Sequence, residues 1–202
     1  MKRSFALLLA LGMTASLHAE DWKPETGFIS LFHGTDLTGW CFREKTKKAD
    51  PNPGAILAKH DGKTEAADAG RYIVKDGVIA VTFPTEADKL TGQLYTVAEF
   101  PKNFVLKLEF RASVNADSGI FIRKPQLQCR DYLVAGPYTK LKQYKAQEWN
   151  QIEVTVKDNV AVCTCNGEVL DAALALAATG PIGLEGDRGV MEYRHIQLKE
   201  LP

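Results

Sequence analysis

The sequence lacks an excess of charge of either sign, and it lacks an apolar run long enough to span a membrane. It carries 25 basic and 25 acidic side chains in 202 residues, so no positive field exists to hold a nucleic-acid backbone. Its apolar stretch near the start, residues 5–11, is far shorter than the roughly 20 residues that a membrane-spanning helix needs. We therefore expect neither a nucleic acid nor a membrane as a partner of the mature protein.

The standard catalytic motifs are missing too. The chain has no Gly-x-Ser-x-Gly elbow, phosphate-binding loop, dinucleotide fingerprint or His-Glu-x-x-His helix. Histidine is scarce: His33 lies in a predicted turn, His60 lies in a polar segment, and His195 alternates with Gln197 and Lys199 as a solvent-facing strand residue. A catalytic triad or a zinc site centred on histidine is therefore not expected.

The first residues predict export. Lys2 and Arg3 precede the apolar run, and residues 17–19 (LHA) resemble a small-residue cleavage site. We interpret residues 1–19 as a signal peptide and residues 20–202 as a single periplasmic or secreted domain; a buried N-terminal helix is the alternative. No cysteine follows the apolar run, so a lipid anchor is not expected.

Four cysteines remain: Cys41, Cys129, Cys163 and Cys165. An even number in an oxidising compartment permits two disulfides, and small buried thiols are the alternative. Cys163 and Cys165 lie two residues apart in a strand pattern, so they point to one face and are poorly placed to bond each other. A zinc site there would need further ligands nearby.

Alternation of apolar and polar residues dominates the chain and predicts β-strands. Residues 104–111 (FVLKLEFR) and 152–157 (IEVTVK) alternate regularly, and Asn166-Gly167 is a strong hairpin signal. Further strands are expected at 72–74, 77–83, 91–97, 119–123, 126–132, 182–185 and 192–201. Many short strands separated by turns predict an all-β sandwich or jelly roll in a single domain.

Three stretches depart from this rhythm. Residues 44–69 are polar, with a PNPG sequence in the middle, and we expect a long surface excursion there. Residues 171–178 are rich in alanine and predict one or two helical turns. In the last strand, Ile196 and Leu198 share a phase that would also turn Arg194 inward, which implies either a bulge near Tyr193 or a buried, hydrogen-bonded arginine.

One predicted strand pair presents a polar face. Gln126, Gln128 and Arg130 share a side of their strand, and Arg123 ends the strand before it. A sheet face of amides and charges can hydrogen-bond several hydroxyl groups, which suits a sugar better than an apolar ligand. An ordinary solvent-facing strand is the alternative.

The order of short sequence blocks resembles the 3-keto-disaccharide hydrolase family, also known as domain of unknown function 1080. Its opening resembles residues 27–40 (GFISLFHGTDLTGW), and later blocks resemble residues 72–79 (YIVKDGVI), 117–123 (DSGIFIR), 148–150 (EWN), 165–167 (CNG) and 180–183 (GPIG). These blocks span nearly all of residues 20–202. The resemblance implies a concanavalin-like jelly-roll sandwich of two antiparallel sheets, an exported protein and an activity on oxidised glycosides.

This chain departs from the family pattern at two positions. Family members have a glutamate shortly after the arginine that corresponds to Arg123, and this chain has Gln126 in its place. The glutamine and aspartate that follow in the family pattern are kept as Gln128 and Asp131. Near the C-terminus, Glu185 replaces a glutamine and Arg188 replaces a histidine. This chain therefore lacks a carboxylate and an imidazole that its relatives have. If the family uses these two residues as a base or as metal ligands, this chain has lost those functions.

The chemistry that the resemblance implies needs a base, a positive group on the C3 oxygen and an acid at the leaving group. We expect Asp131 or Glu185 to act as base or acid, and Arg123 and Arg188 to stabilise the enolate oxygen. Gln126, Gln128 and Glu109 are expected to position hydroxyl groups. No protein metal ligand is assigned; a divalent metal remains an alternative to arginine.

Two other functions are compatible with a sandwich of this kind. A non-catalytic, lectin-like carbohydrate-binding module is favoured by the changes at Gln126 and Arg188, and it would stack sugars on exposed aromatic side chains. We expect Trp40 and Trp149 to be core residues instead. A laminarinase-like glycosidase predicts a Glu-x-Asp-x-x-Glu strand, which the sequence does not contain.

Overall fold

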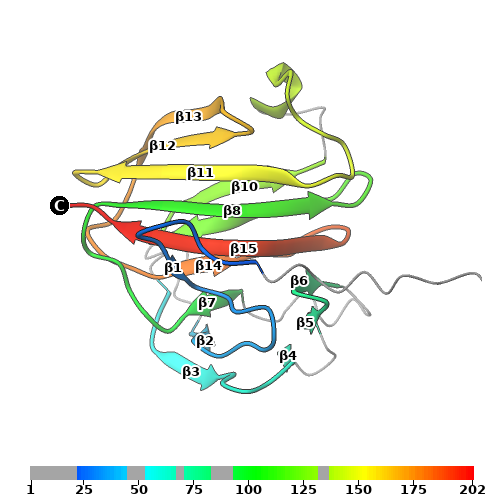
Figure 1. Ribbon diagram of the computed structural model, residues 1–202, viewed down its shortest axis with the longest axis vertical. Helices are drawn as coiled ribbons and strands as arrows, with labels where there is room; N and C mark the ends of the chain where they lie inside the picture. Colours follow the sequence, from blue (N-terminus) through cyan, green and yellow to red (C-terminus); the bar gives the residue numbers. More distant parts are fainter. Residues whose placement is uncertain (1–21, 45–52, 67–70, 83–92, 132–136) are drawn as a thin grey trace, which may run out of the picture.

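Two antiparallel sheets packed face to face make up the molecule (Figure 1). The computed structural model describes residues 22–44, 53–66, 71–82, 93–131 and 137–202; the predicted signal peptide lies outside these residues. The larger sheet has the order β13 (Glu168–Ala175), β12 (Val160–Cys165), β11 (Asn150–Lys157), β8 (Phe104–Ala112), β15 (Met191–Glu200), β6 (Val78–Val81), β5 (Tyr72–Lys75) and β4 (Glu65–Ala66), with β1 (Ile29–Ser30) also pairing with β15.

The smaller sheet lies behind the long strands β11, β8 and β15 in Figure 1. Its order is β10 (Gln126–Arg130), β9 (Asp117–Ile122), β14 (Ile182–Leu184), β7 (Leu94–Thr96), β2 (Trp40–Arg43) and β3 (Ile56–Lys59). Strands distant in sequence are neighbours in both sheets, as expected when the chain crosses repeatedly between two sheets. The predicted all-β, concanavalin-like jelly-roll sandwich is confirmed.

Helical structure is nearly absent from the described part of the chain. A single 3₁₀ turn at Pro137–Lys140 is the one helical segment found there. None of the helices within the described ranges is long and apolar enough to cross a bilayer.

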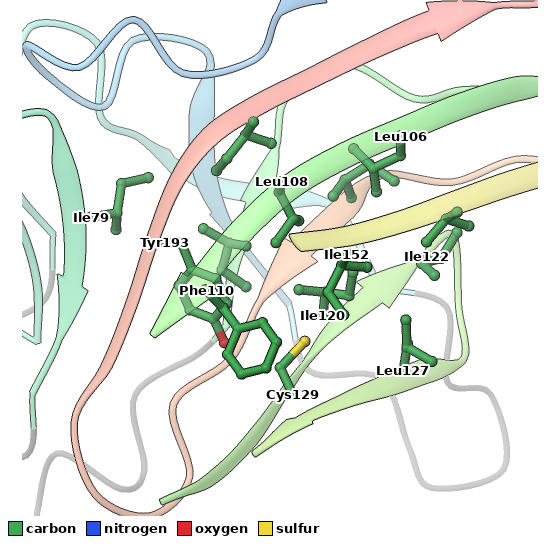
Figure 2. Packing of buried hydrophobic residues seen from close by; sticks show 14 of the residues in the cluster. Ile79, Leu106, Leu108, Phe110, Ile120, Ile122, Leu127, Cys129, Ile152 and Tyr193 are labelled. Carbon is green, nitrogen blue, oxygen red and sulfur yellow. The ribbon is translucent and has the colours of Figure 1, made fainter. Parts of the chain in front are cut away.

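The core lies between the sheets and follows from strand alternation. Every second residue of β8 is buried, with Leu106, Leu108 and Phe110 almost fully inaccessible. Figure 2 shows these side chains facing Ile120 of β9 and Cys129 of β10. Since alternate residues leave a strand on opposite sides, the intervening residues form the outer faces of the sandwich.

The alanine-rich segment is a strand, so the predicted helical turns at 171–178 are wrong. Asn166 and Gly167 both have positive φ, 48° and 83°, which is the geometry of a two-residue hairpin turn. The turn returns the chain onto the open edge of β12, where β13 pairs with it. Pairing at a sheet edge satisfies the backbone groups and outweighs the helix preference of alanine.

The polar segment at 44–69 is also less irregular than expected. Within its described part it contains β3 and β4, and β3 pairs with β2 at the edge of the smaller sheet. Ile56 and Leu57 of β3 are exposed. The PNPG sequence lies partly outside the described residues.

The rhythm of the last strand is broken by a bulge, the first of the two predicted alternatives. The register with β8 shifts between Arg194 and Gln197, and His195 has φ +54°. The extra residue allows Tyr193 and Ile196 to point into the core together. Arg194 consequently lies on the outer face and is not a core arginine.

All four cysteines are buried free thiols, and Cys129, Cys163 and Cys165 belong to the core between the sheets. Cys163 and Cys165 point to the same face, as their spacing predicts, and both are fully inaccessible. Burial raises the pKa of each to about 12. These thiols therefore act as small apolar packing groups.

Candidate functional site

The outer face of the smaller sheet carries two neighbouring rows of side chains. In the first, which we name the aromatic row, Gln126 pairs with Phe121, Phe121 with Gly183 and Gly183 with Tyr95. Paired residues of adjacent strands point to the same side, so the row crosses four strands.

The second row, the carboxylate row, lies two residues further along the same strands. Gln128 pairs with Gly119, and the amide of Glu185 donates to the Gly119 carbonyl at 3.0 Å. Gln93 directly precedes β7 and donates from Nε2 to Glu185 Oε1 at 3.4 Å. Glu185 thus lies in the middle of a row of amide side chains.

The Glu185 carboxylate has neutral hydrogen-bond partners. Gln126 Nε2 donates to Glu185 Oε2, and Gln93 donates to Oε1. Burial raises the pKa of Glu185 to about 7; Asp187 and Asp117 add to the rise, while Gln93 and Arg71 oppose it. A carboxyl group with a pKa close to neutral can both accept and return a proton at physiological pH.

Two tyrosines from the larger sheet fix the backbone beneath this carboxylate. The Tyr193 hydroxyl donates to the Glu185 carbonyl at 2.8 Å and lies 3.2 Å from the Gly119 carbonyl. The Tyr72 hydroxyl donates to the Leu184 carbonyl at 3.0 Å. Both rings extend through the core from the larger sheet. Their hydrogen bonds hold the backbone at Glu185 in place, although Glu185 follows the last residue of β14.

Two glycines allow side chains to lie flat on this face. A Cβ at Gly119 would approach Gln126 Cγ and Nε2 to 2.7 Å, and one at Gly183 would approach the Tyr95 ring to 2.5 Å. Any larger residue would push these side chains off the sheet. The glycines therefore let Gln126 reach across to Glu185.

Arg71 supplies positive charge beside the carboxylate. It is 3% exposed, and its Nη2 donates to the Gly186 carbonyl, the residue after Glu185. Its charge lowers the pKa of Glu185, against the larger effect of burial. Arg71 directly precedes β5 of the larger sheet, so it reaches this site from across the sandwich.

The far end of the face carries ion pairs. Asp117 receives Arg130 Nε at 3.1 Å and Arg188 Nη2 at 3.7 Å. Arg188 also donates from Nε to the Asn115 carbonyl at 3.0 Å, and about half of its side chain is exposed. Arg188 therefore lies at the rim, directly after Asp187.

Asp131 lies near this end but faces elsewhere. Its Oδ2 accepts the Asn115 amide at 3.1 Å, and its Oδ1 accepts the Tyr144 hydroxyl at 2.8 Å. Asn115 has φ +58°, so the carboxylate holds a turn that few residues other than glycine adopt readily. Asp131 therefore has different partners from Glu185, whose carboxylate is bonded by Gln93 and Gln126.

Arg123 is anchored within the protein. It is 1% exposed and donates to the carbonyls of Phe100 (2.7 Å), Lys102 (2.7 Å) and Ala177 (2.9 Å) and to Asn159 Oδ1 (2.7 Å). These bonds join loops at the end of the sandwich. The structure does not place this guanidinium beside Glu185.

Glu109 lies on the opposite side of the molecule. It belongs to β8 of the larger sheet, where it accepts Arg194 Nε at 2.7 Å and lies 3.2 Å from His195 Nδ1. Trp149 also lies on this face and is half-buried, so the prediction that it is a core residue is wrong. Its ring centroid lies 4.7 Å from Cζ of Arg111 and 4.0 Å from Cζ of Arg194. Trp40 is fully buried, as expected.

The structure thus brings together Glu185, Gln126 and Gln128, with Arg188 at the rim. It separates them from Arg123, Asp131 and Glu109. Gln93 and Arg71 were not identified from the sequence. Gln93 could have been, because it alternates with Tyr95 in a predicted strand, whereas nothing local marks Arg71.

The donor set around Glu185 does not fit a divalent cation. Its nearest partners are two amide nitrogens and, nearby, a guanidinium, all of which are hydrogen-bond donors. No group of three or more His, Cys, Asp or Glu side chains placed to hold a metal occurs within the residues that the structure describes. Arg71 supplies positive charge beside this carboxylate.

Solved structures share the fold. A protein from Parabacteroides distasonis ATCC 8503, provisionally described as a glycosyl hydrolase, superposes with a TM-score of 0.62 at 20% identity, covering 87% of this chain and 95% of that one. A second such protein from the same organism has a TM-score of 0.54 at 18% identity, covering 68% and 94%. A search of curated proteins finds no significant match.

Fold and site together define a jelly-roll sandwich with a half-buried carboxylate of near-neutral pKa on the outer face of its smaller sheet. The sequence profile of the 3-keto-alpha-glucoside-1,2-lyase-like domain matches residues 27–199. The chain belongs to this family, which confirms the resemblance drawn from its sequence blocks.

Proposed function

We propose that this protein is an exported enzyme that cleaves 3-keto-glycosides by elimination and hydration, with Glu185 as its base. The observation that carries the proposal is the Glu185 carboxyl, half-buried, bonded to Gln93 and Gln126, and with a pKa raised to about 7. Membership of the 3-keto-alpha-glucoside-1,2-lyase-like family supports this class of substrate.

The reaction follows from the acidity that a ketone gives to its neighbouring C–H bond. Ionised Glu185 removes the proton from C2, and the C–H electron pair forms an enolate with the C3 oxygen. The enolate returns to a ketone as a C1=C2 double bond forms, and the C1 substituent leaves with its bonding electrons and takes up the proton that Glu185 had accepted from C2. Addition of water across C1=C2, with hydroxyl on C1 and hydrogen on C2, completes net hydrolysis.

Other residues of the face have supporting roles in this proposal. Arg71 and Arg188 supply positive charge for the enolate oxygen, a role in which arginine is always ionised. Gln126, Gln128 and Gln93 hold substrate hydroxyls and orient the carboxylate. The amide oxygen of Gln128 is buried and accepts no hydrogen bond, so it is an acceptor without a donor.

The other residues expected from the sequence have different roles in this proposal. Arg123 and Asp131 stabilise the ends of the sandwich, and Glu109 stabilises the opposite face, because their charged groups are occupied there. The signal peptide over residues 1–19, the mature domain over residues 20–202 and the periplasmic or secreted location are retained as part of the proposal.

The test is to incubate the purified mature protein with a 3-keto-glucoside and with its unoxidised parent, with and without divalent metal, and to follow release of the leaving group. Release from the keto form alone, without a need for added metal, is expected. Equal release from the unoxidised parent would contradict the elimination mechanism, since that sugar has no acidified C2–H.

A carbohydrate-binding module is the second candidate. The half-buried Phe121 ring on the outer face favours it, since such modules stack sugars on aromatic side chains. Binding of the keto-glycoside without release, measured by calorimetry on the same samples, would identify the protein as a binder.

A further inference from the structure

The aromatic row beside Glu185 has no assigned role in proton transfer. Phe121 and Tyr95 lie on either side of Gly183, with ring centroids 5.9 Å apart and ring planes at 48°. The absence of a side chain at Gly183 lets the Tyr95 ring lie across it, because a Cβ there would lie 2.5 Å from Tyr95 Cε1. Gln126 ends the row on β10, and beyond Tyr95 the pairing continues through Cys41 to Lys59 at the other edge of the sheet.

This row lies one step from the carboxylate. Same-face residues two apart on a strand are separated by about 7 Å, and Gly183 and Glu185 have that spacing. Burial raises the pKa of Tyr95 to about 12, and the negative charge of Glu185 contributes to the rise. The aromatic row and the base therefore face the same space.

The opposite side of Glu185 has different chemistry. There Asp117, Arg130 and Arg188 form ion pairs, which offer no apolar surface to a sugar or aryl ring. Beside Glu185, the half-buried Phe121 ring offers a hydrocarbon face to such a group, and the Tyr95 ring, 8% exposed, packs against it. The two sides of the carboxylate thus separate a charged end from an uncharged aromatic end.

We infer that Phe121, supported from the side by the buried Tyr95 ring, forms the subsite for the leaving group, and that this group is an uncharged ring presenting a C–H face. The inference rests on the proposed function, because it places the keto-sugar at Glu185. A second sugar and an aryl group share this chemistry, and the experiment distinguishes them.

Three substrates test the inference: the 3-keto derivatives of methyl glucoside, p-nitrophenyl glucoside and a glucosyl-glucose disaccharide. Phe121 is half-buried on an outer face, so Phe121→Ala leaves no core cavity. We expect kcat/KM to fall roughly fivefold to tenfold for the two ring-bearing leaving groups and less than twofold for methyl. A loss for only one of the two identifies whether the sugar or the aryl group is the natural occupant.

Two control variants make the result specific. Phe121→Leu keeps bulk but removes the flat ring, and it should fall between wild type and Phe121→Ala. Val162→Ala removes an exposed apolar side chain from the larger sheet and should change nothing. Equal losses for all three substrates, or no loss for any, would overturn the inference.

The two proposals fail in different ways. If wild-type protein releases no leaving group from any substrate, the catalytic proposal fails, and the subsite is measured by calorimetric binding of the intact keto-glycosides. Tighter binding of the ring-bearing compounds that Phe121→Ala abolishes would support the subsite. Equal binding of all three by wild type would overturn it.

Discussion

The outer faces of the two sheets both carry glutamates, but the hydrogen-bond partners of these glutamates differ between the faces. On the larger sheet, Glu109 accepts Arg194 at 2.7 Å and Glu192 accepts Arg111 at 2.5 and 3.0 Å. On the smaller sheet, Glu185 is hydrogen-bonded by neutral amides, and its pKa rises to about 7. The larger sheet thus places its glutamates in ion pairs, whereas the half-buried Glu185, with neutral partners, can exchange protons near neutral pH.

The larger sheet uses its charges to stabilise the fold. Glu25 accepts Lys107 at 2.8 Å and Gln197 at 3.2 Å, which fastens the N-terminal segment to β8 and β15. Trp22 stacks on His195 with ring centroids 4.7 Å apart. The charges named here have partners of opposite sign or aromatic neighbours, so this face is suited to stability and the smaller sheet to chemistry.

The largest expected difference between the faces is in catalysis. Glu185→Gln should lower kcat by a factor of about 10² to 10⁴, the range for loss of a general base, because the amide cannot accept the C2 proton. Glu109→Gln makes the same change on the other face and should leave kcat within about twofold. Initial rates on a 3-keto-glucoside measure both; an unchanged rate in Glu185→Gln would remove Glu185 from the reaction.

A second carboxylate beside the first should shift the pH dependence. Gln126 contacts Glu185 directly, so Gln126→Glu places two carboxylates in one site, and these cannot both ionise readily. The acid limb of the pH–rate profile should move upward from near pH 7 by about one pH unit, lowering the rate at pH 7 roughly fivefold. Gln151→Glu, an exposed change on β11, is the matched control, and a shift of equal size there would indicate a general effect of net charge.

The smallest expected difference is in stability, and its sign should be opposite on the two faces. Because folding raises the pKa of Glu185 to about 7, its ionisation opposes folding. The cost is absent below about pH 4.5 and fully present above about pH 7, where it reaches on the order of 3 kcal/mol. Glu185→Gln should therefore raise the free energy of unfolding at pH 8 and leave it unchanged at pH 4.

Glu109→Gln removes the partner of Arg194 and should lower the free energy of unfolding by about 1 kcal/mol at pH 7. Thermal unfolding at pH 4, 7 and 8 measures both variants, with about 2–4 °C expected per kcal/mol for a domain of this size. Stabilisation of both variants at pH 8 would show that the two carboxylates have equivalent environments, against the contrast drawn above.

Much of the fold could be predicted because local patterns determine it. The alternation in β8 reports which side chains face the core, and Asn166-Gly167 specifies a hairpin without help from distant residues. The segment after that hairpin was predicted as helix because alanine favours helix locally. This segment forms a strand because it pairs with the open edge of β12. The local sequence does not show that this edge is available.

The candidate site could be predicted only in part. Gln126 and Gln128 were identified because they alternate on one strand, and Glu185 because it stands where the family pattern has a glutamine. Glu109 has the same local pattern as a sugar-facing residue, yet its strand belongs to the other sheet. Alternation tells which residues share a face but not which of the two outer faces they reach.

The sequence by itself determined most of the strands and the all-β class, because these follow from periodicity and turn chemistry, and the order of its sequence blocks indicated the family. Only the tertiary structure decided that Glu185 meets Gln93, Gln126 and Arg71, which come from three distant segments. It also decided that Arg123 is a structural anchor. Burial and partners set the proton affinity of a carboxyl group, and both arise only when the two sheets pack together.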